Sequence, residues 1–130
     1  MEIDQLNHVA LHVHDLERSV RFYRDVLRLP EIHRPAFNFP GAWFRIGSGS
    51  GADRQELHLI GREQPKEGGA YSVPRERHFA MKVVDMQAAA AHLREQGVEF
   101  TGPNPRPDGA QQIFLRDPDG HVVELCALAG

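Results

Sequence analysis

The sequence has little cysteine, no long apolar run and no excess of positive charge. Its single cysteine, Cys126, cannot form an internal disulfide, which favours a reducing cytoplasm. No apolar stretch approaches the length needed to cross a membrane, and the polar N-terminal residues do not fit a secretion signal. The formal net charge of −3 provides no basic patch for nucleic acid. We therefore expect a cytoplasmic protein with no membrane or nucleic-acid partner.

The composition is otherwise that of a soluble globular protein, with 41% hydrophobic and 25% charged residues. A chain of 130 residues can bury the core of one domain but not of two large ones. Eight histidines are many for this length, so their placement carries most of the functional argument. We expect a single domain that spans residues 1–130.

The first half begins with a strand at residues 6–13, where apolar and polar positions alternate. One face of this strand is apolar, and the other carries His8 and His12. Asp15 then predicts the N-cap of a helix that Pro30 ends. Three further strands are predicted at residues 31–39, 42–46 and 55–60. A proline within the first of these three predicts an edge strand.

The second half follows the same plan. A strand at residues 77–84 precedes a helix at 86–96, which Asp85 caps. Residues 98–101 form a short strand, and three prolines within 102–109 predict a loop. Two strands at residues 112–116 and 122–128 complete this half.

The two halves therefore repeat each other. His8 and His78 lie 70 residues apart, and so do the two capping aspartates. In the last strand of each half, His58 and Glu124 lie 66 residues apart, each between two apolar residues. This self-similarity predicts an α+β fold made of two copies of one strand–helix–three-strand (βαβββ) module. The modules would occupy residues 1–61 and 77–130, joined by a linker at 62–76.

Glu124 is the unusual residue of its strand. The turn Asp117-Pro118-Asp119-Gly120 leads into Val-Val-Glu-Leu, which is apolar apart from this carboxylate. An unpaired buried charge is costly, so Glu124 either faces solvent or meets a cation. Alternation places His8, His58 and His78 with it on the sheet face away from the helices. Three imidazoles and a carboxylate are a common ligand set for one divalent Zn, Ni, Mn, Fe or Co ion, and this set does not choose among them.

These patterns resemble the vicinal oxygen chelate superfamily, which includes glyoxalase I, methylmalonyl-CoA epimerase, fosfomycin-resistance proteins, extradiol dioxygenases and bleomycin-binding proteins. The motifs that carry the resemblance span nearly the whole chain and are Asn7-His8-Val9-Ala10, Asp15-Leu16-Glu17-Arg18-Ser19, Arg77-His78-Phe79-Ala80, Asp117-Pro118-Asp119-Gly120 and Val123-Glu124-Leu125. The resemblance implies a curved mixed sheet that forms a cup, with the helices outside. It also implies metal ligands from the first and last strands of each module, which are His8, His58, His78 and Glu124.

Two residues, His58 and Glu56, are candidates for the fourth metal ligand. The resemblance implies a fourth ligand from the last strand of the first module, usually Glu or Gln, at the position that His58 occupies here. Glu56 lies two residues earlier on the same face, where it is either the ligand itself or a general base. We prefer His58, because its apolar neighbours match those of Glu124.

Three further residues of the predicted cup are candidates for substrate contact, namely His12, Trp43 and Lys82. The resemblance to bacterial-type glyoxalase I implies an arginine that binds the glutathione carboxylate at this position of the first strand. This chain has His12 there instead. This departure weakens a glutathione hypothesis.

The resemblance implies a metal-dependent, glyoxalase-like isomerase or lyase that acts on a small oxygen-rich substrate. Glu124 or Glu56 would move a proton beside a carbonyl that the metal polarises. The alternatives are a small extradiol-type ring-cleaving dioxygenase, a fosfomycin-type transferase and a non-enzymatic drug-binding protein. Relatives of this family often dimerise, so we expect a homodimer.

Overall fold

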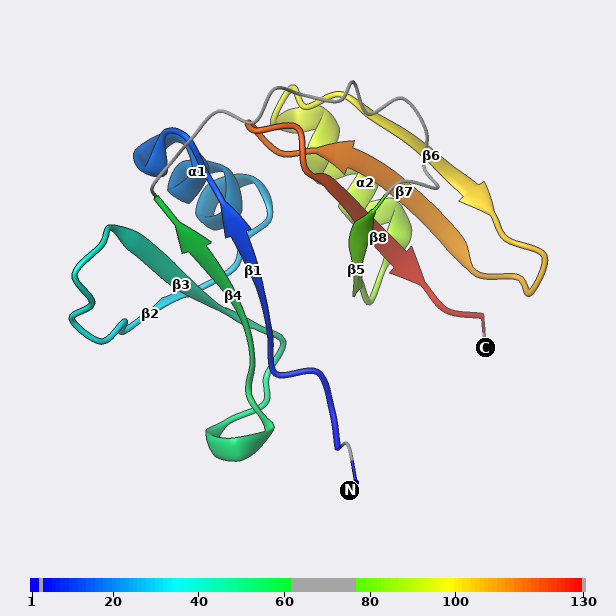
Figure 1. Cartoon of the computed structure of the whole chain (residues 1–130). Helices are drawn as coiled ribbons and strands as arrows, with labels where there is room; N and C mark the ends of the chain where they lie inside the picture. The colour runs from blue at the N-terminus through cyan, green and yellow to red at the C-terminus, as the bar shows by residue number, and fades with distance from the viewer. Residues whose placement is uncertain (3, 62–76, 130) are drawn as a thin grey trace. The chain divides into compact units, whose positions relative to one another are not determined.

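The computed structural model describes residues 1–2, 4–61 and 77–129, and Figure 1 shows its helices and strands. The chain divides into two compact units, Met1–Gly68 (unit 1) and Gly69–Gly130 (unit 2). The linker predicted at residues 62–76 lies outside the described residues. Among the described residues, each unit contains one four-stranded sheet and one α-helix.

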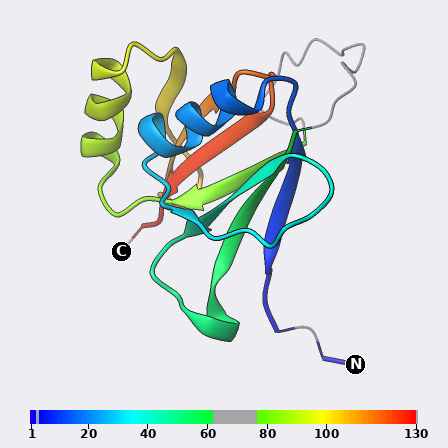
Figure 2. The same cartoon turned by 90° about the vertical axis from the view of Figure 1, so that its left-hand side faces the viewer.

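Unit 1 is built as a strand, a helix and three strands. Its elements are β1 (His8–His12), α1 (Leu16–Arg21), the π-helical turn η1 (Phe22–Val26), β2 (Glu31–Ile32), β3 (Gly41–Ile46), the 3-10 turn η2 (Gly51–Asp53) and β4 (Gln55–Ile60). The sheet order is β1-β4-β3-β2, in which β1 runs parallel to β4 and the other pairs are antiparallel. Figure 2 shows β1, β3 and β4 side by side.

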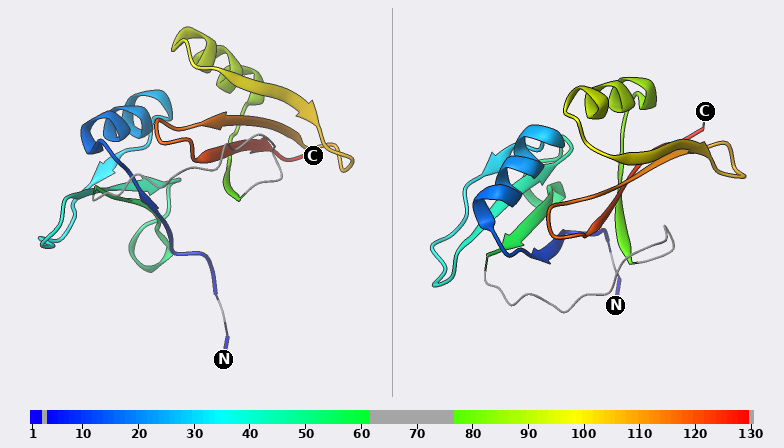
Figure 3. Two further views of the ribbon diagram at one scale, coloured as in Figure 1. Left: turned by 45° about the horizontal axis from the view of Figure 1, so that its top comes forward. Right: turned by 90° about the horizontal axis from the view of Figure 1, so that it is seen from above.

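Unit 2 has the same construction. Its elements are β5 (His78–Lys82), α2 (Met86–Glu95), β6 (Phe100–Pro105), β7 (Gln111–Arg116) and β8 (Val122–Ala127). The sheet order is β5-β8-β7-β6, with β5 parallel to β8, and α2 lies alongside this sheet (Figure 3). The predicted α+β fold with two βαβββ modules is therefore confirmed.

Both helices begin at the predicted aspartates. The side chain of Asp15 accepts a hydrogen bond from the backbone N–H of Arg18, and that of Asp85 accepts one from Ala88, each at 3.1 Å. The first helix ends differently from its prediction, because α1 gives way to the π-helical turn after Arg21. Arg28 then adopts a φ of 59°, a left-handed conformation that ends the helix before Pro30.

The core of each unit lies between its helix and its sheet. In unit 1, Tyr23 of the helical segment packs against Phe44 of β3, with ring centroids 6.2 Å apart and both side chains buried. In unit 2, Leu93 of α2 and Ile113 and Val123 of the sheet are buried. The opposite face of each sheet is thereby left for polar side chains.

Two strands differ in extent from the sequence expectation. The strand predicted at residues 31–39 is confined to Glu31–Ile32, on the sheet edge where it was expected. The loop predicted at 102–109 instead begins as part of β6, which continues to Pro105. This strand tolerates prolines because β6 is also an edge strand, so half of its N–H groups need no partner. Its pairing with β7 shifts register between Thr101 and Asn104.

Candidate functional site

The register of the sheet in unit 1 gathers its polar residues on one face. In the parallel pair of β1 and β4, His8 lies beside Glu56 and Ala10 lies beside His58. In the antiparallel pair of β3 and β4, Trp43 lies opposite His58. Paired residues share a face of the sheet, so these side chains project away from α1, as the sequence predicts.

The imidazole of His58 is enclosed between two other rings. The Trp43 ring stacks on it with centroids 3.9 Å apart and planes at 3°, and the His8 ring lies at 4.2 Å and 18°. These contacts fix the plane of the His58 ring. The predicted substrate-contact residue Trp43 is thus a neighbour of the predicted ligands of unit 1.

Glu56 is a buried carboxylate, 8% exposed, with both oxygens engaged. Oε1 lies 2.7 Å from Nε2 of His58, and Oε2 accepts a hydrogen bond from Nε of Arg54 at 2.7 Å. Burial raises the pKa of this carboxyl, but the hydrogen bonds from His58 and Arg54 outweigh burial and leave the pKa below its ordinary value. Glu56 is therefore ionised at neutral pH.

The pKa of His58 is also lowered. Burial is the largest cause, and the nearby His8 and Arg34 act in the same direction, against the opposing effect of Glu56. His58 is therefore neutral at pH 7 and carries one ring proton. Because the ionised Glu56 can only accept a hydrogen bond, that proton lies on Nε2 and the lone pair on Nδ1. A neutral imidazole with a free lone pair is the form that binds a metal or accepts a proton.

Unit 2 repeats this arrangement strand for strand. Ala80 of β5 lies beside Glu124 of β8, as Ala10 of unit 1 lies beside His58. Phe114 of β7 lies opposite Glu124 at the position that Trp43 holds in unit 1. The repeat found in the sequence therefore extends to the pairing of individual residues.

Glu124 is buried, with 4% of its surface exposed, and it has two hydrogen-bond partners. Oε1 lies 3.1 Å from Nε2 of His78, and Oε2 accepts a hydrogen bond from the side-chain amide of Gln112 at 2.9 Å. The Phe114 ring contacts His78 edge-on, with centroids 5.6 Å apart. The carboxylate that was conspicuous in the sequence thus meets a histidine of the predicted ligand set.

The separation of His78 and Glu124 fits two neighbouring ligands of one metal ion. Bonds of about 2.0–2.2 Å place adjacent donor atoms about 2.8–3.6 Å apart in octahedral or tetrahedral coordination, and Nε2 and Oε1 lie 3.1 Å apart. In unit 1, the side chain of Asn7 contacts Nδ1 of His8, and that of Glu56 contacts Nε2 of His58. The other ring nitrogen, Nε2 of His8 or Nδ1 of His58, is then the donor atom that each imidazole can offer to a metal. Carboxylate or amide partners of this kind commonly orient metal-binding histidines.

Each unit supplies two of the four predicted ligands. Within the described residues of the chain, no group of three or more His, Cys, Asp or Glu side chains lies close enough together to hold a metal ion. The two remaining predicted contact residues, His12 and Lys82, are exposed at the ends of β1 and β5. They lie on the same sheet faces as His8 and His78, because alternate residues of a strand share a face.

Three polar residues of these faces were missed by the sequence analysis. Arg54 binds Glu56, and its place two residues earlier in an alternating run is a signal that the sequence contains. Gln112 binds Glu124 from the neighbouring strand, a pairing that only the register reveals. Arg34 belongs to the loop between β2 and β3, for which no periodicity gives a side-chain direction.

No helix in the described part of the chain is long and apolar enough to span a membrane.

Comparison with known proteins gives a family and several relatives. The sequence profile described as the Glyoxalase/Bleomycin resistance protein/Dioxygenase superfamily matches residues 5–125. "Glyoxylase I 4" of Arabidopsis thaliana is 30% identical, over 97% of this chain and 72% of the relative. A lactoylglutathione lyase of Haemophilus influenzae is 32% identical, over 93% and 90%. The metallothiol transferase FosB of Staphylococcus epidermidis is 30% identical, over 96% and 82%.

Solved structures show the same fold. A Bacillus anthracis protein assigned to the glyoxalase family aligns with a TM-score of 0.79 at 22% identity, over 99% of this chain and 98% of that one. A point mutant of the fosfomycin resistance protein FosX from Listeria monocytogenes, in complex with Mn(II) and a dihydroxypropylphosphonic acid, aligns with a TM-score of 0.72 at 20% identity. That alignment covers 98% of this chain and 95% of FosX.

Proposed function

This chain belongs to the glyoxalase/bleomycin resistance protein/dioxygenase superfamily, and from this premise we propose that it is a divalent-metal-dependent lyase or isomerase of the glyoxalase type. Its substrate would be a small, oxygen-rich molecule. The relatives named lactoylglutathione lyase support this reaction class. The observation that carries the proposal is the contact of His78 with the buried Glu124 at 3.1 Å, on a strand register that unit 1 repeats.

We assign the metal ligands to His8, His58, His78 and Glu124. When bound, a divalent ion of this set would supply Lewis-acid polarisation of a substrate oxygen. His58 is preferred to Glu56 as the fourth ligand, because His58 lies beside Ala10 in unit 1 as the ligand Glu124 lies beside Ala80 in unit 2. The donor atom of His58 would be Nδ1, since Nε2 donates to Glu56.

Glu124 is the residue that we assign to proton transfer. One of its oxygens lies near His78, and the other accepts a hydrogen bond from the neutral amide of Gln112. A carboxylate held in this way can remove a proton from carbon beside a polarised carbonyl and return it to the neighbouring carbon. Glu56, predicted from sequence as a catalytic residue, would instead keep the His58 ring in place.

The experiment that tests this function combines metal analysis with turnover. Protein purified without added metal is assayed for bound Zn, Ni, Mn, Fe and Co, and then for turnover of a hemithioacetal substrate. We expect about one ion per chain and turnover that a chelator abolishes. His78→Ala should lose both, while the control His92→Ala, on α2, should lose neither. Metal binding without hemithioacetal turnover would refute the lyase reaction, and absence of any bound metal after reconstitution would refute the metal site.

A second candidate is modification of a phosphonate antibiotic. It is favoured by the FosB relative at 30% identity and by the arginine of unit 1 described below. Thiol addition to fosfomycin, measured by loss of the epoxide, distinguishes it from lyase chemistry. The third enzyme class in the family description, ring-cleaving dioxygenation, is tested by oxygen uptake in the presence of catechol.

We also propose a homodimer in a reducing cytoplasm. The lone Cys126 supports such a compartment, since it has no partner for an internal disulfide. Light scattering of the purified protein gives the oligomeric state directly. A monomer mass at all concentrations would refute the dimer.

A further inference from the structure

We propose that Arg34 is an anion-binding residue of unit 1 that takes a carboxylate or phosphonate group of the substrate. Its guanidinium is placed on the polar face of the unit 1 sheet, is held by aromatic rings, and retains donors without partners. The proposal rests on the proposed function only in assigning the anion to a substrate. Binding of a free anion at Arg34 needs no metal.

The placement of the guanidinium follows from a glycine. A Cβ added to Gly41 would lie 2.9 Å from both Nε and Nη2 of Arg34, so the guanidinium covers this glycine. Alternation along β3 puts Gly41 on the same face as Trp43, which lies opposite His58. In unit 2 the equivalent position of β7 holds Gln112, whose amide reaches Glu124. The glycine of unit 1 thus makes room for a cationic group where unit 2 has a neutral one.

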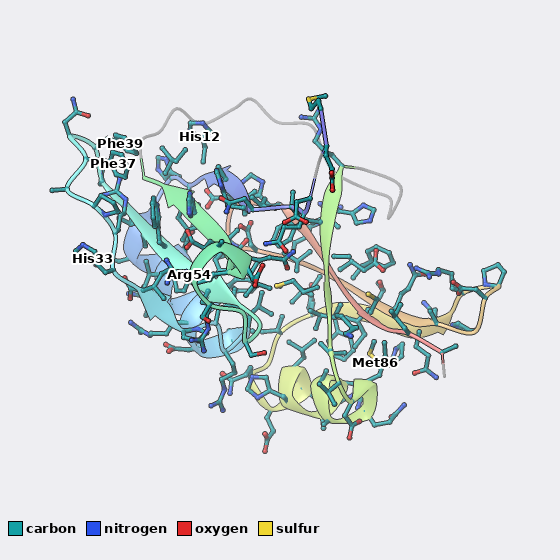
Figure 4. The ribbon with its side chains drawn as sticks, turned by 90° about the horizontal axis from the view of Figure 1, so that it is seen from below. His12, His33, Phe37, Phe39, Arg54 and Met86 are labelled. Carbon is teal, nitrogen blue, oxygen red and sulfur yellow. The ribbon has the colours of Figure 1, made fainter. Side chains whose placement is uncertain are left out.

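Aromatic side chains and a carbonyl hold Arg34 in this position. Its guanidinium carbon lies 4.9 Å from the ring centroid of Phe37 and 4.8 Å from that of Phe39, both within the range of cation–π contact. The two rings stack on each other at 5.4 Å, and Nη2 donates to the backbone carbonyl of Phe39 at 2.9 Å. Figure 4 shows both phenylalanines together on the loop between β2 and β3. These contacts hold the guanidinium in one position without the help of a ligand.

The charge of Arg34 has no carboxylate partner among the described residues. Arg24, Arg54 and Arg106 each form an ion pair with a nearby acid, but Arg34 has only the Phe39 carbonyl. Its Nε is the one buried side-chain nitrogen or oxygen in the described part of the chain that lacks a hydrogen-bond partner. A buried donor of a charged group without a partner is costly. An oxyanion would satisfy it and neutralise the charge in one contact.

Two neighbouring features agree with a ligand site. Phe37 is 46% exposed although it is a large apolar side chain, and it also contacts Trp43 at 6.0 Å. Because Nε is enclosed, an anion reaches it only when a neighbouring group shifts, and Phe37 is an exposed neighbour of the guanidinium. The chain of contacts from Arg34 through Phe37 and Trp43 ends at His58. A substrate anchored at Arg34 would thus present its other end towards His58.

The test titrates the whole 130-residue chain with methylphosphonate and with acetate, both as purified and after treatment with a chelator. The side-chain Nε–H resonance of Arg34 is followed by NMR, and neutral acetamide is the comparison. We expect saturable shifts of this resonance with at least one of the two anions and none with acetamide. Shifts with methylphosphonate alone would assign a phosphonate or phosphate group, and shifts with acetate alone would assign a carboxylate.

Variants distinguish anion binding by the Arg34 guanidinium from a non-specific effect of positive charge. Arg34→Gln should weaken anion binding by about 10-fold or more, because a charge-assisted hydrogen bond is lost. Arg24→Gln removes the same charge from an exposed, paired site and should leave binding unchanged. Arg34→Lys keeps the charge without the planar fork and should bind with intermediate strength. If Arg34→Gln does not fold, the shift of the wild-type Nε–H and the Arg34→Lys affinity decide the question.

Anion binding that persists in metal-free protein but vanishes in Arg34→Gln supports the site whatever the reaction is. No shift of the Nε–H with either anion, or equal weakening by Arg24→Gln and Arg34→Gln, would overturn it. Loss of metal binding in His78→Ala with anion binding retained would leave this inference standing and test the metal site alone.

Discussion

At the scale of single residues, the pair of Glu56 and His58 decides which of them can bind a metal. Glu56 accepts hydrogen bonds from His58 and Arg54, and a neutral imidazole that donates from Nε2 has its lone pair on Nδ1, where it can bind a metal. Arg54 lowers the pKa of Glu56 and so keeps this carboxylate ionised as the acceptor for Nε2 of His58. The hydrogen bonds of this pair thus orient His58 as a ligand, with Glu56 as the residue that holds its ring.

The first prediction concerns Glu56→Ala. Loss of the carboxylate that orients a metal-binding imidazole typically lowers metal affinity about 10–100-fold, and we expect this range here. Competition with a chelating dye measures the affinity, and the control Glu31→Ala removes an exposed carboxylate of β2 with no effect. If Glu56→Ala abolishes metal binding as completely as His78→Ala does, Glu56 is itself the ligand and His58 is not.

The sequence predicts which side chains lie on the polar face of each sheet when a regular strand carries them. His8, His58, His78 and Glu124 follow from alternation and from the repeat, because a strand fixes the direction of every side chain it bears. The position of Arg34 cannot be predicted in this way, because Arg34 lies in a loop without a repeating pattern. Its side-chain direction depends on contacts with Phe37 and Phe39 of the same loop and with Gly41 of β3. The assignment of the four ligands to one metal remains a prediction.

At the scale of elements, the helix N-termini were predictable because their signal is local. An aspartate three residues before an orphan backbone N–H satisfies it irrespective of the rest of the fold. The end of α1 was not predictable to the same degree. The π-helical turn and the left-handed Arg28 depend on how the buried Tyr23 seats against β3, which is a tertiary effect.

The second prediction concerns Asp85→Ala. The Asp85 side chain accepts from the backbone N–H of Ala88 at 3.1 Å, and removal of such a cap costs about 1 kcal/mol of unfolding free energy. Urea denaturation measures this loss, and Asp85→Ser should recover most of it because serine also caps. Equal destabilisation by Ala and Ser would mean that the hydrogen bond does not contribute.

The β6–β7 hairpin carries a pH-dependent contact. The side-chain hydrogen bonds of Arg106, together with the backbone N–H of Ala110, lower the pKa of Asp108 to about 2. A carboxyl whose pKa is lower in the folded chain than in the unfolded chain stabilises the fold above its unfolded pKa. That contribution is lost as the pH falls through the folded value, so the hairpin contact is complete at neutral pH and weakens only in strong acid.

The third prediction follows from this contact. In an NMR titration, Asp108 should have a pKa near 2, and Arg106→Gln should raise it towards the ordinary value of about 3.9. Asp53, for which no ion pair is found among the described residues, is the internal comparison. An unchanged Asp108 pKa in the Arg106 variant would show that the backbone N–H of Ala110, not the guanidinium, sets its acidity.

At the scale of the whole molecule, each unit has its own sheet, its own helix core and half of the predicted ligands. Two donors from one unit alone bind a divalent ion poorly, because structural and catalytic metal sites commonly need three or four protein ligands. The proposed site would therefore tie the stability of the chain to the metal. A ligand that binds only the folded state raises the unfolding free energy by an amount set by its concentration and affinity.

The fourth prediction is that metal removal lowers the thermal stability of the whole chain. At a free metal concentration about 100 times the dissociation constant, the stabilisation is about 2.7 kcal/mol, which corresponds to several degrees in the unfolding temperature of a chain of this size. Differential scanning calorimetry with and without a chelator measures the shift. His78→Ala should unfold at the same temperature under both conditions, because its metal is already lost, whereas His92→Ala should show the full shift. If neither the chelator nor added metal changes the unfolding temperature of the wild-type protein, the folded chain does not bind a metal ion.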